Sequence, residues 1–368
     1  MAITGDSDTN SIQIYDIISI DESNNAFEIV GMVPIIQTNT SIQAKFVTLS
    51  GDGNFLVVNT NSYAQVYARP GYDDDSRILN WEEYGQRFPI SNHTNNNTTI
   101  SAVSISISHD GMIFAMAIPD FKVNVYKMAN DNNNNNIWSL LGSSISKPFE
   151  DSDSFGNSIS LSSNGRRIAI GAEGSGAVYI YKFDGEDWTN LLNDNGNILG
   201  GSNNGNDRFG YSVSMNNDGS RLAVGSPEYS GYTDSLSNSG RCVIYDINEV
   251  KNNGGHSNTI VIGESIFGEE ENENLGHIVQ LSDDGNQIGI SSIGKNIVRV
   301  FDLALNDSSK DHQRSWNQYR KNFIQESAGY GYGSAISLSS KNTLLVGAPP
   351  TSDSKENLNG KIFLYSVI

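Results

Sequence analysis

The sequence is poor in the residues and runs that mark several classes of protein. Its 368 residues include one cysteine, Cys242, so no disulfide can form within the chain. The apolar run Arg241-Cys-Val-Ile-Tyr245 around it favours a buried structural thiol. No apolar run approaches the ~18 residues of a transmembrane helix, and we expect no membrane insertion.

Positive charge is also scarce. The chain has 23 lysines and arginines against 42 aspartates and glutamates, which gives a formal net charge of -19. Nucleic acids and anionic membrane surfaces bind cationic patches, so we expect neither as a partner.

The spacings that accompany common catalytic and metal sites are missing as well. The five histidines are scattered without a zinc-like spacing, and there is no Gly-x-Ser-x-Gly elbow or Walker loop. We therefore predict that the protein is not an enzyme and binds no metal or other cofactor.

What the chain has in quantity is glycine and short apolar alternation. Charged residues are 18% and hydrophobic residues 37% of the chain, and 36 residues are glycine. Such a composition suits many short strands joined by polar turns, because glycine is a poor residue for a helix interior.

An internal repeat of roughly 50 to 60 residues predicts the fold, since radially repeated sheets have such periods. Each copy alternates apolar and polar residues on both sides of a turn, and the turn is usually Asn-Gly or Asp-Gly, which indicates a β-hairpin. The turn glycines are spaced by 58, 54, 54 and 66 residues. The six copies are Phe46–Val58, Val103–Ala117, Phe155–Ala172, Phe209–Pro227, His277–Ser291 and Ala335–Gly347.

A third and a fourth strand follow most hairpins. The third strands are predicted at Tyr63–Tyr67, Val123–Tyr126, Val178–Tyr181, Val243–Tyr245, Ile297–Phe301 and Ile362–Tyr365. All four tryptophans, Trp81, Trp138, Trp188 and Trp316, stand shortly afterwards, where packing between blades explains them. The prediction is an all-β β-propeller of mostly four-stranded antiparallel blades.

The N-terminal residues predict part of one more blade. Residues 1–5, 12–15 and 27–31 resemble the second, third and fourth strands of the repeat. We expect one propeller domain over residues 1–368, with a partial blade at 1–36 and six hairpin repeats at 41–368. Seven blades follow from this count, and six blades, with the N-terminal strands closing the last one, is the alternative.

The repeats resemble the FG-GAP repeats of integrin α-subunits and of many surface proteins. Phe-Gly stands at Phe155-Gly156 and Phe209-Gly210, and the Gly-Ala-Pro element stands at Gly347-Ala-Pro349 and Gly225-Ser-Pro227. The resemblance covers nearly the whole chain and implies a propeller used in adhesion or scaffolding. In that family some hairpin loops bind calcium, but here Ser214 and Leu222 replace the first and ninth oxygen ligands. We therefore expect plain turns at the Asp-Gly pairs and no calcium site.

The loops of one face are the predicted binding site. Connections from strand two to strand three, and from strand four to the next blade, emerge on the same face of a propeller. The connections 226–240 and 348–360 are long. We expect a partner to bind an acidic, tyrosine-bearing surface there. The candidate residues are Glu150, Asp153, Asp207, Tyr229, Tyr232, Glu270, Glu271 and Glu273.

The leading hypothesis for function is a binding or scaffolding propeller that engages a protein partner through this acidic face. A glycan-binding surface propeller is the alternative, and a hydrolase using carboxylates of the central funnel is a third. We expect a cytoplasmic protein if Met1 is the native start, and an extracellular or cell-surface protein if residues precede it.

Overall fold

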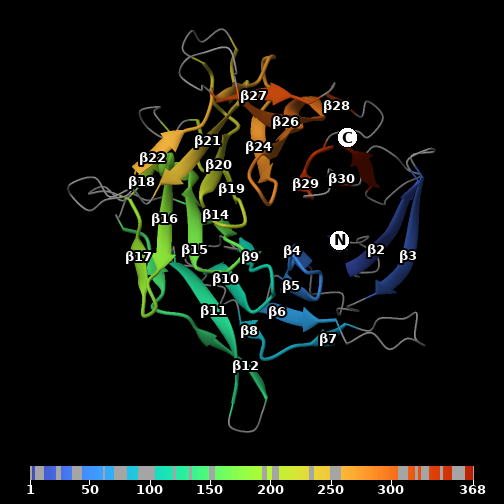
Figure 1. The fold of residues 1–368 in the computed structure, drawn as a ribbon, viewed down its shortest axis with the longest axis vertical. Helices are drawn as coiled ribbons and strands as arrows, with labels where there is room; N and C mark the ends of the chain where they lie inside the picture. Colours follow the sequence, from blue (N-terminus) through green and yellow to red (C-terminus); the bar gives the residue numbers. More distant parts are fainter. Residues whose placement is uncertain are drawn as a thin grey trace, which may run out of the picture. The chain divides into compact units, whose positions relative to one another are not determined.

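The computed structural model describes most of the chain as antiparallel strands (Figure 1). It describes residues 2–4, 12–21, 26–34, 44–60, 63–69, 81–89, 104–118, 122–131, 135–148, 154–192, 197–200, 207–231, 236–248, 258–305, 314–319, 322–324, 331–339, 343–349 and 361–367. The chain divides into two compact units, Met1–Ser146 and Lys147–Ile368, and each is described by itself. In the described residues, no helix is long and apolar enough to cross a membrane.

The first unit contains three sheets. One has the strands β1 (Ala2–Thr4), β2 (Ile12–Asp21) and β3 (Ala26–Pro34). The next has β4 (Ala44–Leu49), β5 (Phe55–Thr60), β6 (Tyr63–Ala68), β7 (Glu82–Glu83) and β8 (Phe88–Pro89). The third has β9 (Ile105–Ile107), β10 (Ile113–Ile118), β11 (Lys122–Asn130), β12 (Asn136–Leu140) and β13 (Ile145–Ser146).

The second unit contains four sheets, coloured from green to red in Figure 1. The first has β14 (Phe155–Leu161), β15 (Arg167–Ala172), the short 3₁₀ turn η1 (Glu173–Ser175), β16 (Ala177–Phe183), β17 (Trp188–Asn190) and β18 (Asn197–Leu199). The second has β19 (Ser212–Met215), β20 (Arg221–Ser226), β21 (Arg241–Asn248), β22 (Asn258–Val261) and β23 (Ile266–Phe267). The third has β24 (Leu275–Leu281), β25 (Gln287–Ser292), η2 (Ile293–Lys295), β26 (Ile297–Leu305), β27 (Arg314–Gln318) and β28 (Phe323–Ile324). The last has β29 (Ala335–Leu338), β30 (Thr343–Ala348) and β31 (Lys361–Ser366).

The all-β propeller fold is confirmed, and the expected seven blades are corrected to six. Each hairpin repeat builds one sheet, whereas the N-terminal strands β1 to β3 precede the first Asp-Gly hairpin and form a separate three-stranded sheet. Among the described residues these strands pair only with one another. Six blades is the number that the alternative expectation gave.

The outer strand of the predicted four-stranded blades is divided into two pieces. In the sheet of β14 to β18, β17 pairs with the last residues of β16 while β18 pairs with its first residues. The same division occurs in the other four complete blades. The outer edge of a blade therefore consists of one short strand at each end.

The core lies between consecutive blades. One buried cluster joins Ala169 and Ile180 of one blade to Phe209, Leu222 and Val224 of the next. Strands two and three are buried on both faces, so β15 has buried residues from Ile168 to Ala172 without alternation. Cys242, fully buried in the next such cluster, is a structural thiol as predicted, and burial raises its pKa above the usual range.

Two of the tryptophans bind the preceding blade through a hydrogen bond. The indole Nε1 of Trp138 donates to the carbonyl of Tyr84 at 3.0 Å, and that of Trp316 donates to the carbonyl of Ile262 at 2.8 Å. Packing between blades, predicted from their place in the repeat, is confirmed for these two residues.

The Asp-Gly pairs form turns, as expected. In the turn of β24 and β25, the Asp284 carboxylate accepts hydrogen bonds from the Ser282 hydroxyl (2.7 Å) and the Asn286 backbone (2.9 Å). The preceding blade reaches the same turn, because Arg221 Nη1 donates to the Gly285 carbonyl at 2.9 Å. The turns thus connect neighbouring blades as well as neighbouring strands.

The glycines of the Phe-Gly and Gly-Ala-Pro elements meet at the blade junctions. Gly210 and Gly276 have φ of 88° and 91°, a region that favours glycine. A Cβ on Gly225 would lie 2.0 Å from the Gly276 carbonyl oxygen, and one on Gly171 would lie 2.1 Å from that of Gly210. At these two junctions, strand two can therefore pack this closely on the backbone of the next blade only because it carries glycine.

We predict that Gly225→Ala lowers the free energy of unfolding by about 3 kcal/mol or more, because the methyl group collides with backbone that cannot move independently. Gly289→Ala is the matched control on strand two of the next blade, since its Cβ would meet nothing closer than 3.6 Å. Urea unfolding of both variants measures the difference. Equal midpoints for the two variants would refute the proposed close packing at Gly225.

Candidate functional site

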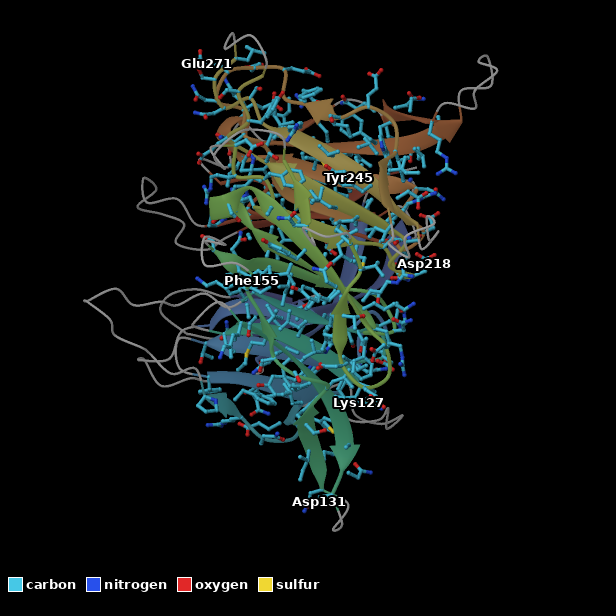
Figure 2. All side chains as sticks on the ribbon, turned by 90° about the vertical axis from the view of Figure 1, so that its left-hand side faces the viewer. Lys127, Asp131, Phe155, Asp218, Tyr245 and Glu271 are labelled. Atoms are coloured by element: carbon cyan, nitrogen blue, oxygen red, sulfur yellow. The ribbon has the colours of Figure 1, made fainter. Side chains whose placement is uncertain are left out.

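The candidate residues that the structure describes lie on the loops of the second unit. They follow strand two or precede strand one, at the end of the blades away from the hairpin turns. In Figure 2, Glu271 at this end and Asp218 at a hairpin turn lie on opposite sides of the second unit. Glu150, Asp153, Tyr232 and residues 350–360 of the second long loop lie outside the described residues.

Asp207 is buried at a blade junction and is not part of an exposed surface. One of its oxygens accepts a hydrogen bond from the Phe209 backbone at 3.2 Å, and the other lies 3.2 Å from Arg241 Nη2. Arg241 also donates to the Gly200 carbonyl at 2.5 Å. The predicted role of Asp207 in partner binding is corrected, since its carboxylate joins two loops to the start of β21.

Glu273 is corrected in the same way. Its side chain is 0% exposed and its Oε1 lies 2.6 Å from Nη1 of Arg299, which is 2% exposed. The Ser292 hydroxyl donates to the same oxygen at 2.8 Å, and the Glu269 backbone donates to Oε2 at 2.6 Å. Every part of this carboxylate is therefore used inside the protein.

The repeat contains a signal for this burial. Asp207 and Glu273 both stand two residues before the Phe-Gly or Leu-Gly element, and each pairs with an arginine of strand three. An acid that recurs at one position of the repeat, close to a buried glycine, is held in place by the packing of consecutive blades. Because both acids stand in loops, their charge alone predicted that they would be exposed.

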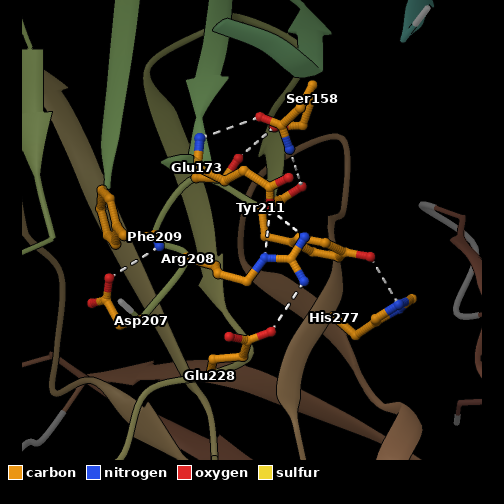
Figure 3. A network of polar contacts seen from close by, with 10 residues as sticks. Ser158, Glu173, Asp207, Arg208, Phe209, Tyr211, Glu228 and His277 are labelled. Carbon is orange, nitrogen blue, oxygen red and sulfur yellow. Dashed lines mark hydrogen bonds and ion pairs between the residues drawn. The ribbon is translucent and has the colours of Figure 1, made fainter. Parts of the chain in front are cut away.

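A polar network around Arg208 lies at the blade junction that also contains Asp207 (Figure 3). The Arg208 guanidinium bridges two carboxylates, with Nη2 2.7 Å from Glu173 and Nη1 3.1 Å from Glu228. It also lies 4.4 Å from the centre of the Tyr211 ring. Burial raises the pKa of the Glu173 carboxyl despite the arginine that lowers it. No sequence motif indicated this network, because its members come from three separate loops.

Tyr211 connects this network to a histidine of the next blade. Its hydroxyl lies 3.1 Å from Nε2 of His277, and the two rings are 5.1 Å apart. Burial, with a smaller contribution from Arg208, lowers the pKa of His277, so the imidazole is neutral at pH 7. The neutral ring suits its place beside a guanidinium.

The exposed Phe267 and the half-buried Tyr229 form an aromatic pair above Arg241. Their ring centres are 5.7 Å apart, and Arg241 lies 4.3 Å from the Tyr229 ring centre. Phe267 is 48% exposed although it is a large apolar residue on the short strand β23. The sequence indicated Tyr229 through its long loop, but Phe267 was missed because it stands on a strand.

Exposed carboxylates follow Phe267 directly. Glu269, Glu270 and Glu271 are all exposed, with side-chain exposures of 68% for Glu269 and 62% for Glu270. Glu270 forms an ion pair with Lys295 at 3.0 Å. We call Tyr229, Phe267, Glu269, Glu270 and Glu271 the acidic aromatic surface. It has an apolar centre and a charged rim, which suits binding better than proton transfer. Among the described residues, no group of three or more histidine, cysteine, aspartate or glutamate side chains could hold a metal ion.

Comparison with known proteins gives the fold and nothing finer. No protein-family model and no curated protein matches the chain. A periplasmic gluconolactonase of Pseudomonas aeruginosa has a similar structure, with a TM-score of 0.58 and 14% identity over 99% of this chain and 95% of that one. A functionally unknown protein of Desulfotomaculum acetoxidans has a TM-score of 0.54 and 14% identity, over 93% of this chain and 87% of that one. A protein of Lactobacillus plantarum has a TM-score of 0.55 and 12% identity, over 96% and 90%.

We predict that Glu273→Gln destabilises the protein by about 3 kcal/mol or more, because the buried Arg299 loses its buried counterion and keeps only the exposed Glu269 carboxylate at 3.5 Å. The matched control is Glu270→Gln, which removes a solvent-exposed carboxylate and should change stability by less than about 0.5 kcal/mol. Chemical denaturation measures both. A stable Glu273→Gln variant would show that the carboxylate is not needed for folding.

We also predict that His277 makes stability depend on pH. Its pKa is lower in the folded state than in the unfolded chain, so its contribution is complete above about pH 6.5 and is lost as pH falls through the folded-state pKa. Urea midpoints of the wild type should therefore decline more between pH 7.5 and pH 5.5 than those of His277→Gln. Parallel declines would mean that the imidazole has the same pKa in both states.

Proposed function

We propose that the protein is an FG-GAP-like propeller that binds a protein partner, without catalysis, through the acidic aromatic surface. The observation that carries the proposal is the exposed ring of Phe267, packed at a tilt against Tyr229 beside three exposed glutamates. Large aromatic residues that remain exposed on a rigid strand are typical centres of protein interfaces.

The rigidity of the aromatic pair supports this role. Phe267 pairs with Arg241 across the β21–β23 ladder, and Arg241 is itself fixed by Asp207 and the Tyr229 ring. A partner that packs on Phe267 therefore meets a preorganised group and loses less conformational entropy on binding.

The charges favour a basic partner. Glu271 forms no ion pair with a described residue, and the chain carries a formal net charge of -19. Lysine and arginine side chains of a partner would gain from this field during encounter and at the rim. The network in Figure 3 supports a role without catalysis, because the Arg208 guanidinium forms ion pairs with both carboxylates, Glu173 and Glu228.

A glycan-binding function is the second candidate, and the same aromatic pair is the observation that favours it. Sugar rings stack on exposed aromatic side chains, and neighbouring carboxylates accept hydrogen bonds from hydroxyl groups. A glycan partner would be insensitive to salt, whereas a basic protein segment would dissociate as ionic strength rises.

We predict that peptides selected by the wild type from a random 12-residue display library are rich in lysine and arginine. These peptides should bind at least tenfold more weakly to the double variant Glu270→Lys and Glu271→Lys, and also to Phe267→Ser. The control is the double variant Glu186→Lys and Asp283→Lys, which makes the same charge change at two exposed positions away from this surface.

Comparison of the two double variants separates an effect of the charge at this surface from an effect of the net charge of the protein. Equal binding to both would contradict the assignment of the surface. Selection of no peptide, together with binding on a glycan array that Phe267→Ser abolishes, would replace the protein partner with a glycan.

A further inference from the structure

The outer strand β22 has one unpaired edge. It pairs with β21 in the register Asp246 with Ile260 and Ile247 with Thr259, and no other described strand pairs with it. The Ile262 backbone donates to the Ile244 carbonyl at 2.8 Å in the same register. Because donors alternate in an antiparallel ladder, the N–H of Ile260 faces β21, while those of Thr259 and Val261 face away from it.

This edge lacks the features that usually protect an outer strand. Its four residues, Asn258–Val261, include no charge and no proline, which are the ordinary means of blocking strand addition. Ile260 is 56% exposed and Val261 is 46% exposed, so two consecutive apolar side chains on opposite faces of the strand meet solvent. By contrast, β27, the equivalent strand of the next blade, begins with Arg314.

The apolar edge is continuous with an acidic rim. Glu264, exposed between β22 and β23, forms no ion pair with a described residue, and Phe267 follows on β23. Asp246, opposite Ile260, forms a long ion pair with Arg314 at 3.9 Å, so Glu264 is the carboxylate of this rim that has no ionic partner among the described residues. A second copy of this chain would bring like charge to the rim, whereas a basic segment would complement it.

We propose that β22 accepts an added strand from a basic protein segment in which valine or isoleucine alternates with lysine or arginine. The main chain of the segment pairs with Thr259 and Val261, its apolar side chains cover Ile260 and Val261, and its cationic side chains reach Glu264. The inference deepens the proposed function, since it rests on a protein partner and gives that partner a conformation.

The outward N–H of Thr259 gives a sharp test. Thr259→Pro removes this donor and leaves the ladder to β21 intact, while the matched control Thr259→Val keeps the donor. Peptides are selected by the wild type from a random 12-residue display library, and their binding to each variant is measured by biolayer interferometry. We expect at least tenfold weaker binding to Thr259→Pro, unchanged binding to Thr259→Val, and alternating basic and apolar residues in the peptides.

Amide hydrogen exchange provides the second measurement. Bound peptide should slow exchange at Thr259 and Val261 at least tenfold relative to the free protein. Ile260→Pro, which removes a donor to β21, should lower the urea midpoint, whereas Thr259→Pro should not; a midpoint lowered equally by both would refute the register.

The outcomes separate the inference from the proposed function. Selected peptides that lose affinity for Phe267→Ser but bind Thr259→Pro as tightly as the wild type would overturn strand addition and keep a protein-binding surface. Selection of no peptide would overturn both. A dimer in sedimentation that Thr259→Pro dissociates would replace the basic segment with a second copy of the chain.

Discussion

The close approach of consecutive blades at the glycine junction is the constraint on which the rest of the second unit depends. Gly225 lies against the backbone of Gly276, and any side chain there would enter the space of a carbonyl oxygen. This contact sets the distance at which Phe209 or Leu275 fills the core between two blades. It also brings the acid three residues before the glycine next to strand three of the blade that the glycine begins.

The buried ion pairs follow from that proximity. A carboxylate enclosed at the junction needs a counterion and donors, and Arg299 with the Ser292 hydroxyl and the Glu269 backbone supplies them for Glu273. Such pairs are costly to bury and costly to break, so they fix the path of a loop more than they add to stability. The loops that bear Tyr229 and Glu270 are consequently held at their base by groups that never reach solvent.

The sequence was sufficient for the repeating parts of the structure and insufficient for what occurs once. The hairpins, the third strands, the turns at Asp-Gly, the buried Cys242 and two of the tryptophan contacts recur or follow from apolar patterning, so they could be predicted. The blade count could not, because residues 1–34 resemble strands of the repeat without carrying its hairpin. The Arg208 network depends on three loops that meet only after folding, and the exposure of Phe267 depends on which face of a short outer strand remains uncovered.

The acidic residues discussed above form two groups with different physical roles. Asp207 and Glu273 are neutralised by arginine and belong to the architecture, whereas Glu264 and Glu271 have no ionic partner in the described residues and belong to the surface. Net charge alone does not distinguish these groups, but their place in the repeat does. The buried acids recur before the Phe-Gly element. The exposed acids occur in a single blade-to-blade loop and beside a single edge strand. A propeller of similar fold with different residues at those two places would have a different binding surface on the same frame, which is why likeness of fold at 14% identity carries no assignment of function.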